Sequence, residues 1–436
     1  MPKESQHAPK SVSKLSAEEL VAAFLYAEKK MTQEMIAEKM GISQSKASRL
    51  LKSAVEAYEV TRRFTAPGKP GFEKRRLEFE TKKEEVLGET ETLDVLLRYQ
   101  TEVAGLNPTD HGLLRNVEVV YAPADGFGRY AGGTEADHYE YIRNFSRRAG
   151  ELLSDRLASA QTFGVSWGAV LHYASETLFA GTQYSGVERR FYPACSTIRT
   201  GQTQFSSTGI ARQLCQRLDA SEHQSSLAVT AFIPLAFSKK KGTGGKLFDN
   251  EREKLAKHLL ESIEEYVDTF GGYGGNRQPA KASQKFGTFL TGLSKFEHPY
   301  GQNFRDFMRA VHTDTNRDPL DEDAVRQLYV GDFSGDLMVK PDLDDNDLAL
   351  AEELRELWTG IKIEDMQEIA KSAASKPAEG EGEARHGVVV LGAGSDRARV
   401  LLHALSLGLV SEIFIDEALH DALNKEAKSA LKKKAG

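Results

Sequence analysis

The sequence predicts an N-terminal all-α domain with a helix–turn–helix, followed by an α/β domain with a largely parallel, Rossmann-like sheet. Residues 32–51 place small and apolar residues at helical spacing on both sides of a glycine. From residue 117 onward, short β-branched runs alternate with longer amphipathic segments, as in parallel sheets with helical connections. The 436 residues are also too many for one small domain.

The first predicted element is a pair of helices joined by a tight turn. Ala37 is small enough to let the helices approach closely, Gly41 supplies the positive φ of the turn, and Ser43 is a suitable N-cap for the second helix. The residues expected in the core are Ile36, Met40, Ile42, Ala47, Leu50, Leu51 and Ala54. Upstream, Ser16 and Glu19 form a capping-box pattern that predicts a supporting helix.

The outer face of the second helix is polar, which predicts contacts with bases and phosphates in a major groove. The predicted DNA contacts are Thr32, Gln33, Gln44, Ser45, Lys46, Ser48, Arg49, Arg62 and Arg63. Residues 58–64 have strand character, so Arg62 and Arg63 lie either on a wing or on an extended linker. An ordinary helical hairpin with a solvated polar face is the alternative to a DNA-binding motif.

The charge of the chain is divided unevenly. Residues 1–76 carry 15 Lys or Arg against 9 Glu and no Asp, which gives a net charge of +6. Because the total is −7, the remaining residues carry a net charge of −13. A basic head on an acidic body is expected of a nucleic-acid-binding domain joined to a sensor domain.

Composition shifts predict three parts. Residues 1–72 form the helix–turn–helix domain, 73–112 a helical linker or dimerisation segment, and 113–436 the α/β domain, with insertions near 238–283 and 341–385. Strands are expected over 117–121, 162–165, 226–234, 388–391 and 411–415. Helices are expected over 138–158, 169–179, 208–218 and 397–407.

Several classes of protein are disfavoured by what the sequence lacks. Cys195 and Cys215 are its only cysteines and lie in no CxxC pattern, so we expect no metal site and no disulfide, in a reducing cytoplasm. No stretch approaches the ~20 apolar residues of a membrane span, and the polar start is no signal peptide. No cofactor is predicted.

Three loops that follow predicted strands are candidates for binding an anion at one edge of the sheet. The Gly392-Ala-Gly394 turn provides backbone amides, and Arg397 would add a guanidinium. Arg397 also occupies the place of the third glycine of a dinucleotide fingerprint, so NAD binding is disfavoured. Phosphate binding and a purely structural tight turn are equally supported by these residues.

The other two loops cover residues 164–168 and 197–208. The first has the GxSxG spacing of a hydrolase nucleophile, but no downstream Asp and His stand out as partners, so no catalytic residue is predicted. The second is rich in Ser, Thr and Gln. Across the three loops, the predicted ligand contacts are Gly164, Ser166, Trp167, Gly168, Arg199, Ser206, Ser207, Gly392, Gly394, Ser395 and Arg397.

Taken together, these motifs resemble the SorC family of sugar-binding transcriptional regulators. Most specific are residues 391–397 (LGAGSDR), 404–410 (ALSLGLV) and 413–419 (IFIDEAL), which are similar to that family's glycine turn, helix and closing strand. The helix–turn–helix start, the loop at 164–168 and residues 330–335 (VGDFSG), similar to its GDI segment, fit in the same order. The resemblance spans most of the chain outside the insertions.

The resemblance implies an isomerase-like α/β domain that binds a phosphorylated sugar, and dimers or tetramers on operator DNA. It adds Asp332, the carboxylate of the GDI-like segment, as a ligand for sugar hydroxyls, with a solvated turn as the alternative. The chain departs from the family where Ala169 and Val170 replace an Arg-Thr pair, and where Phe333 and Ile415 replace an Ile and a Thr.

The leading interpretation is a cytoplasmic transcription regulator, not an enzyme, that binds operator DNA as a homodimer or homotetramer and responds to a small, phosphorylated sugar or related anion. No membrane partner is expected. Two alternatives remain open. One is a phosphosugar isomerase or deaminase fused to a DNA-binding head, and the other is a regulator with a decayed pocket controlled by a protein partner.

Overall fold

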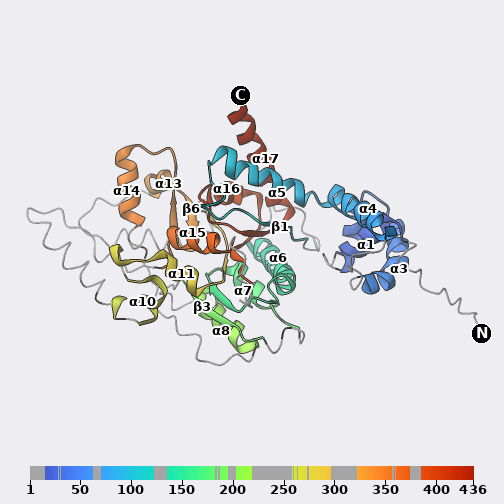
Figure 1. Ribbon diagram of the computed structural model, residues 1–436, viewed down its shortest axis with the longest axis horizontal. Coiled ribbons are helices and arrows are strands. Elements are labelled where there is room, and N and C mark those ends of the chain that lie inside the picture. Colours follow the sequence, from blue (N-terminus) through green and yellow to red (C-terminus); the bar gives the residue numbers. More distant parts are fainter. Residues whose placement is uncertain are drawn as a thin grey trace, which may run out of the picture.

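Two parts are visible in the computed structural model, a lobe formed by helices α1–α4 and an α/β body (Figure 1). The structure describes residues 15–61, 70–121, 135–194, 203–218, 258–295, 322–373 and 384–436, apart from a few positions inside these ranges. The expected strand at 226–234 and the predicted contacts Arg62, Arg63 and Arg199 lie outside the described residues.

The N-terminal lobe is a small helical domain. Its helices are α1 (Ala17–Ala27), α2 (Gln33–Lys39), α3 (Gln44–Thr61) and α4 (Pro70–Leu87). The predicted capping box is confirmed, since the Ser16 amide donates to Glu19 Oε2 at 2.8 Å and the Glu19 amide to Ser16 Oγ at 3.2 Å. Gly41 has the expected φ of +64°, and Ser43 Oγ accepts the Lys46 amide at 3.3 Å.

The predicted core of the helix pair is also confirmed. Ile36, Ala37, Ala47, Leu51 and Ala54 are buried, while Met40, Ile42 and Leu50 are half-buried against them. The strand character predicted for residues 58–64 is wrong for 58–61, because α3 continues to Thr61. Glu56, Ala57 and Glu59 favour helix, and adding residues to an existing helix is easier than starting a strand.

The segment predicted as a helical linker contains more than one helix. Helix α4 ends at Leu87, Gly88 adopts φ +64°, and α5 (Glu89–Arg98) follows and runs into a π-helix, η2 (Tyr99–Val103). Only glycine takes this left-handed conformation without strain, so the chain changes direction at Gly88.

The body is built on a six-stranded sheet, and the predicted α/β class is confirmed. Its strands, in spatial order, are β1 (Asn116–Val119), β9 (Glu412–Ile415), β8 (Gly387–Gly392), β4 (Thr288–Thr291), β2 (Thr162–Val165) and β3 (Arg190–Pro193). Each neighbouring pair is parallel. Four of these strands match the predicted ranges closely, whereas β3 and β4 were not predicted.

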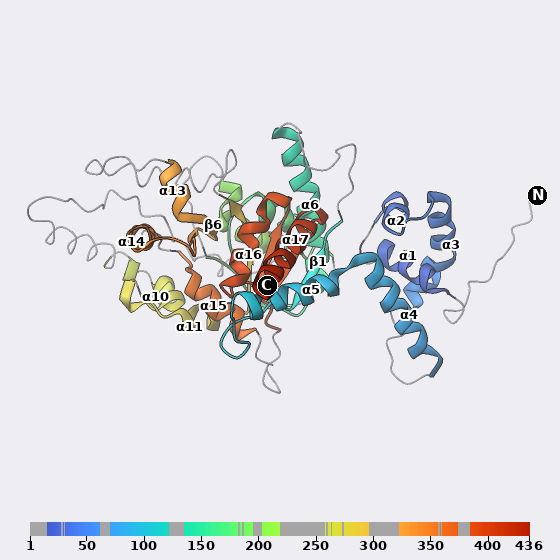
Figure 2. The same ribbon diagram turned by 90° about the horizontal axis from the view of Figure 1, so that it is seen from above.

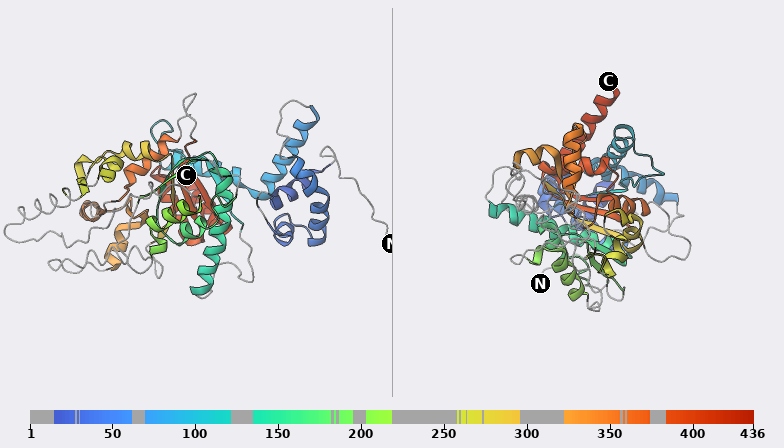
Figure 3. Two further views of the ribbon diagram at one scale, coloured as in Figure 1. Left: turned by 90° about the horizontal axis from the view of Figure 1, so that it is seen from below. Right: turned by 90° about the vertical axis from the view of Figure 1, so that its left-hand side faces the viewer.

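Helices cover both faces of the sheet, in the three-layer arrangement that buries parallel strands (Figure 1). Val389 and Leu391 of β8 face one layer, and Val388 and Val390 face the other. The first layer consists of α6 (Glu135–Arg156), α7 (Ala169–Ser175) and α8 (Ser207–Arg217). The second consists of α5, α11 (Pro279–Lys285), α15 (Ile363–Ser372), α16 (Ala398–Ser406) and α17 (Glu417–Ala435), whose last turns extend from the body (Figure 3).

A second, antiparallel sheet lies beside the first. It consists of β5 (Ser294–Lys295), β6 (Tyr329–Phe333) and β7 (Asp336–Val339). Three helices, α10 (Glu264–Phe270), α13 (Glu322–Leu328) and α14 (Asp345–Arg355), belong to the same side of the body, which is opposite the N-terminal lobe (Figure 2).

The two regions expected to be insertions contain part of the main core. Met366 and Ile369 of α15 and Ala282 of α11 are buried against the sheet. Salt bridges fasten these segments, since Arg277 pairs with Asp365, and Arg355 Nη2 lies 2.9 Å from Asp336 Oδ2. The described parts of residues 258–283 and 363–373 are therefore integral to the α/β body.

Candidate functional site

The carboxyl ends of the parallel strands meet at one edge of the sheet, where ligands bind in open α/β folds. The register places Gly392 of β8 beside Ile415 of β9, Thr291 of β4 beside Val390 of β8, and Val165 of β2 beside Leu290 of β4. The loops that follow these strands, including two of the three predicted ligand loops, therefore lie next to one another.

Residues 392–397, here called the glycine turn, are held in place by Asp416. The Gly394 amide donates to both carboxylate oxygens of Asp416, at 3.1 Å each. Asp416 also caps α17 by accepting the Leu419 amide at 2.9 Å, and it accepts the hydroxyl of Tyr141 from α6. Burial raises the pKa of Asp416, although these hydrogen bonds and the charge of Arg397 favour the carboxylate.

Arg397 lies directly over the glycine turn. Its Nη1 donates to the Ala393 carbonyl at 2.5 Å and to Asp396 Oδ1 at 3.3 Å, and its side chain is 11% exposed. A Cβ at Gly394, whose φ is +94°, would lie 3.0 Å from that nitrogen. The structure thus brings Gly394 and Arg397 together, since the Arg397 amide also donates to the Gly394 carbonyl at 3.1 Å, and within the described residues the side-chain hydrogen bonds of Arg397 come from Nη1.

Two glycines of the predicted ligand set have a structural reason to be glycine. A Cβ at Gly392 would lie 2.8 Å from Leu293 Cδ1, and one at Gly164 would lie 2.5 Å from Phe289 Cδ2. Close packing gives glycine a structural role at both positions, so their presence alone is no indication of a ligand. Ser395, by contrast, is exposed at the turn.

The loop 166–168 is bound into the sheet by its backbone. The Ser166 amide donates to the Leu290 carbonyl and the Gly168 amide to the Phe205 carbonyl, both at 2.9 Å. Trp167 packs edge-to-face on Trp358, with ring centroids 5.3 Å apart. Two of the amides expected to bind an anion are therefore engaged within the protein.

The loop before α8 is described only from residue 203 onward. Ser206 is the N-cap of α8 and accepts the Gly209 amide at 3.0 Å. Ser207 is fully buried, and its hydroxyl has no hydrogen-bond partner within the described residues. The structure therefore places Ser206 in a capping role and Ser207 beneath the surface.

Asp332 lies in β6, close to the tip of the hairpin that joins β6 and β7. Its Oδ1 accepts the Gly335 amide at 3.1 Å, and Ser334 and Gly335 have φ values of +58° and +96°. Ser334 Oγ lies 2.7 Å from Thr291 Oγ1 at the end of β4, so the hairpin tip is bound to the candidate edge. Asp332 is 1% exposed, and the alternative of a solvated turn is wrong.

Sequence reasoning missed Asp416, Tyr141, Thr291 and Ser334 as residues of this edge. Asp416 carried a signal, because it directly follows a predicted strand and begins a helix. Tyr141 carried none, because one tyrosine within a 22-residue helix is unremarkable in a sequence. Thr291 belongs to a strand that was not predicted, and Ser334 lies in the GDI-like segment 330–335, of which only Asp332 was predicted as a contact.

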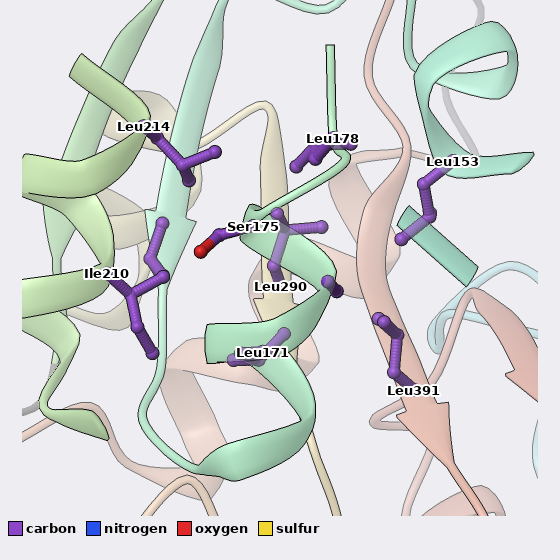
Figure 4. A pocket seen from close by; sticks show the side chains of 10 residues that line it. Leu153, Leu171, Ser175, Leu178, Ile210, Leu214, Leu290 and Leu391 are labelled. Atoms are coloured by element: carbon purple, nitrogen blue, oxygen red, sulfur yellow. The ribbon is translucent and has the colours of Figure 1, made fainter. Parts of the chain in front are cut away.

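A small cavity lies between the sheet and the helices α6, α7 and α8 (Figure 4). It is lined by Leu153, Val165, Leu171, Ala174, Ser175, Leu178, Ile210, Leu214, Leu290 and Leu391. Its one hydroxyl, from Ser175, donates to the His172 carbonyl at 2.6 Å. The cavity is therefore a packing defect of the core and not a site for a polar ligand.

The predicted DNA-contacting face of α3 is exposed. Gln44, Ser45, Ser48 and Arg49 face solvent, and Lys46 is half-buried beside them. Lys46 Nζ lies 2.9 Å from Glu18 Oε2, with both side chains at least 40% exposed. Such surface pairs contribute little and exchange readily for another anion. Of the two predicted residues at the start of α2, Thr32 is the N-cap and Gln33 is exposed.

Two features are absent from the residues that the structure describes. No helix there combines the length and the apolar character needed to cross a membrane. In the same residues, no three side chains of His, Cys, Asp or Glu gather in a way that would hold a metal ion.

No family profile and no curated protein matches the sequence of the chain. Among solved structures, the sorbitol operon regulator SorC from Klebsiella pneumoniae is 16% identical, with 93% of this chain and 98% of that chain covered and a TM-score of 0.45. The chain is similar to SorC-type regulators.

Two other solved structures are similar to the chain. A transcriptional regulator from Streptococcus pneumoniae TIGR4 is 13% identical over 77% of this chain and 98% of its own, with a TM-score of 0.45. A DeoR family transcriptional regulator from Listeria monocytogenes is 15% identical over 76% and 99%, with a TM-score of 0.41.

Proposed function

We propose that this protein is a DNA-binding transcription regulator whose α/β domain binds a small, phosphorylated sugar or a related anion. The observation that carries the proposal is the orientation of α3. Its apolar side lies in the core of the N-terminal domain, while Gln44, Ser45, Ser48 and Arg49 are exposed on the other. This is the arrangement that a recognition helix needs to enter a major groove.

The decisive experiment is selection of bound sequences from random DNA by the full chain. We expect enrichment of a sequence with two-fold symmetry, because the proposed regulator is a homo-oligomer whose copies each contact one half-site. Binding should weaken steeply with salt, as phosphate contacts release counterions. Recovery of no enriched sequence would contradict the proposal. Native mass spectrometry of the full chain then distinguishes a dimer from a tetramer.

The ligand part of the proposal is supported by the glycine turn. Arg397, whose side chain is 11% exposed, supplies a guanidinium at the carboxyl edge of the sheet, and Ser395 of the same turn is exposed. An Arg beside a turn of small residues suits a phosphate group. Calorimetry with a panel of phosphosugars, their unphosphorylated counterparts and inorganic phosphate tests this. Equal binding of the phosphorylated and unphosphorylated sugars would contradict a phosphate site.

The proposal assigns no catalytic step to the domain. Asp332 and Asp416, two buried carboxylates of this edge, each accept backbone amides of the turns that they hold. A carboxylate with such bonds acts as a structural anchor and is poorly placed to exchange protons with a substrate. Turnover of any phosphosugar that binds, followed over time by nuclear magnetic resonance, would contradict this assignment.

A further inference from the structure

The N-terminal domain is docked onto the first strand of the sheet through a buried ion cluster, which consists of Lys29, Glu89 and Glu118. Lys29 Nζ lies 2.7 Å from Glu89 Oε1 and 2.5 Å from Glu118 Oε1, and the lysine side chain is 4% exposed. Glu89 Oε1 also accepts the Val119 amide at 2.8 Å. The loop after α1, the start of α5 and the edge of β1 therefore meet at one point.

The buried ammonium of Lys29 depends on its two carboxylate partners. A buried ammonium without its carboxylates carries a large desolvation penalty. Burial alone would lower the pKa of Lys29, but Glu89 and Glu118 outweigh it and raise that pKa. The docked arrangement is thus preferred strongly over one in which Lys29 remains buried alone.

A second set of contacts joins the same domain to the start of α17. Tyr121, just after β1, packs in the core of the N-terminal domain, and Lys39 Nζ lies 4.8 Å above the centre of its ring. Lys39 Nζ is also 2.8 Å from Glu417 Oε1. Glu417 directly follows Asp416, the residue that holds the glycine turn.

Helix α6 also connects Asp416 to the N-terminal domain. Tyr141 donates its hydroxyl to Asp416, and Arg148 donates from Nη2 to the Lys29 carbonyl at 2.7 Å. These two residues are seven positions apart, or about two turns, so they lie on the same side of the helix. Two of the elements that contact Asp416, α6 and α17, therefore also contact the N-terminal domain.

We propose that Asp416 is a positioning residue that couples the glycine turn to the docking of the N-terminal domain. An anion that takes the Gly394 amide displaces the Asp416 carboxylate, because one N–H cannot serve both and two anions at this distance repel each other. Displacement weakens the cap of α17 and the bonds to Tyr141, and with them the contacts Lys39–Glu417 and Arg148–Lys29. The N-terminal domain is then released from β1.

The ligand in this scheme rests on the proposed function, whereas the coupling is a property of the ligand-free chain. Coupling between two sites is reciprocal, so a change at the glycine turn must alter the docking of the N-terminal domain, and a change in the docking must alter the glycine turn. This allows the coupling to be tested without sugar and without DNA.

The test is hydrogen–deuterium exchange of the full chain, followed in peptides that cover residues 31–40 and 392–397. Tyr141→Phe removes one hydroxyl at the glycine-turn end, and Glu118→Gln weakens the ion cluster at the other end with little change in size. We expect each variant to raise exchange in both peptides by about fivefold or more, the lower range of measured couplings. Arg98→Ala, which removes an exposed pair with Glu102, is the control and should change neither.

Effects confined to the mutated end in both variants would overturn the proposal. Both substitutions are nearly isosteric, and circular dichroism confirms that each variant is folded. If one fails to fold, Lys39→Ala replaces it, because Lys39 is half-buried at the edge of the core and its ammonium pairs with the exposed carboxylate of Glu417.

A second arm adds inorganic phosphate to the wild-type chain. We expect protection of residues 392–397 together with faster exchange of residues 31–40. Protection of the glycine turn with no change at residues 31–40 would overturn the proposal. If both variants raise exchange in both peptides but the wild-type chain binds no phosphate, the ligand of the proposed function is contradicted. The coupling between the glycine turn and the N-terminal domain is then still supported.

Discussion

Gly394 donates its backbone N–H to the carboxylate of Asp416, and the two residues come from the ends of neighbouring strands, β8 and β9. The pair makes the glycine turn and the start of α17 one structural unit. Asp416 is 2% exposed, and its carboxylate accepts the Gly394 amide. A ligand anion would have to compete with that carboxylate for the same amide.

Replacing Asp416 by Ala should destabilise the fold. The variant loses the cap of α17, which contributes about 0.5–2 kcal/mol, and leaves the Gly394 amide without its acceptor, at a cost of about 1–3 kcal/mol. We expect the free energy of unfolding, measured with urea, to fall by about 2–4 kcal/mol. Asp421→Ala on the same helix, where the side chain is 83% exposed, is the control and should change little.

Replacing Lys46 and Arg49 together by Ala should abolish sequence-specific DNA binding and leave the fold intact, because both lie on the polar side of α3. Each lost base contact costs about 1–3 kcal/mol, and each lost phosphate contact lowers the salt slope by about one. Gel shifts with the selected DNA measure the affinity. Lys82→Ala on α4 is the matched control, and an unchanged affinity in the double variant would remove α3 from the interface.

Arg397→Ala should weaken ligand binding by about tenfold to a hundredfold, since a charge-assisted hydrogen bond contributes about 1.5–3 kcal/mol. DNA binding without ligand should be nearly unchanged. Calorimetry of wild type and variant with the same phosphosugar measures the loss. Arg399→Ala provides a close control, because that side chain lies two positions away and is 85% exposed.

Two outcomes would contradict the role given to Arg397. Equal affinities would make it a surface arginine beside a structural turn. Loss of folding would place it in the architecture, through its bond to the Ala393 carbonyl.

Glu412 should make the stability of the fold sensitive to acid. Burial would raise its pKa, but His386 at 2.9 Å and Arg156 at 2.8 Å outweigh it and lower the pKa from the ordinary 4.5. A carboxyl group with a lowered pKa in the folded state stabilises that state above pH 4.5, and the contribution is lost as the pH falls through the folded-state pKa.

The comparison of wild type with Glu412→Gln isolates this effect. Urea unfolding should show the variant less stable at neutral pH, with the difference shrinking as the pH falls below about 4.5. Glu188→Gln, at a side chain 70% exposed, is the control. A difference between wild type and Glu412→Gln that stays constant with pH would show that Glu412 contributes by its shape and not by its charge.

Local patterns in the sequence predicted much of this fold. The helix pair around Gly41, the capping box at Ser16 and four strands of the main sheet follow from periodicity and turn chemistry within a few residues of one another. Strand β4 escaped prediction because Thr288–Thr291 is only four residues long and buried on both faces, so it shows no alternation.

The candidate site was predictable only in part, because its geometry depends on contacts between distant segments. Lys29 pairs with residues 60 and 89 positions away, and nothing near Lys29 in the sequence marks it as buried. The neighbourhood of Gly394 and Arg397 is local and was predicted, whereas the bond from Tyr141 to Asp416 spans 275 positions.

The buried ion cluster also bears on how such a chain evolves and how it can be engineered. Small helical N-terminal domains can be exchanged between proteins at the linker when they make few contacts with the rest of the chain. Here a junction at Gly88 would separate Lys29 from Glu89 and Glu118 and leave a cation without its partners in the new chimera. An exchanged N-terminal domain that keeps a buried lysine at this position needs both glutamates in its new partner, so recombination at this boundary is restricted to α/β domains that carry them.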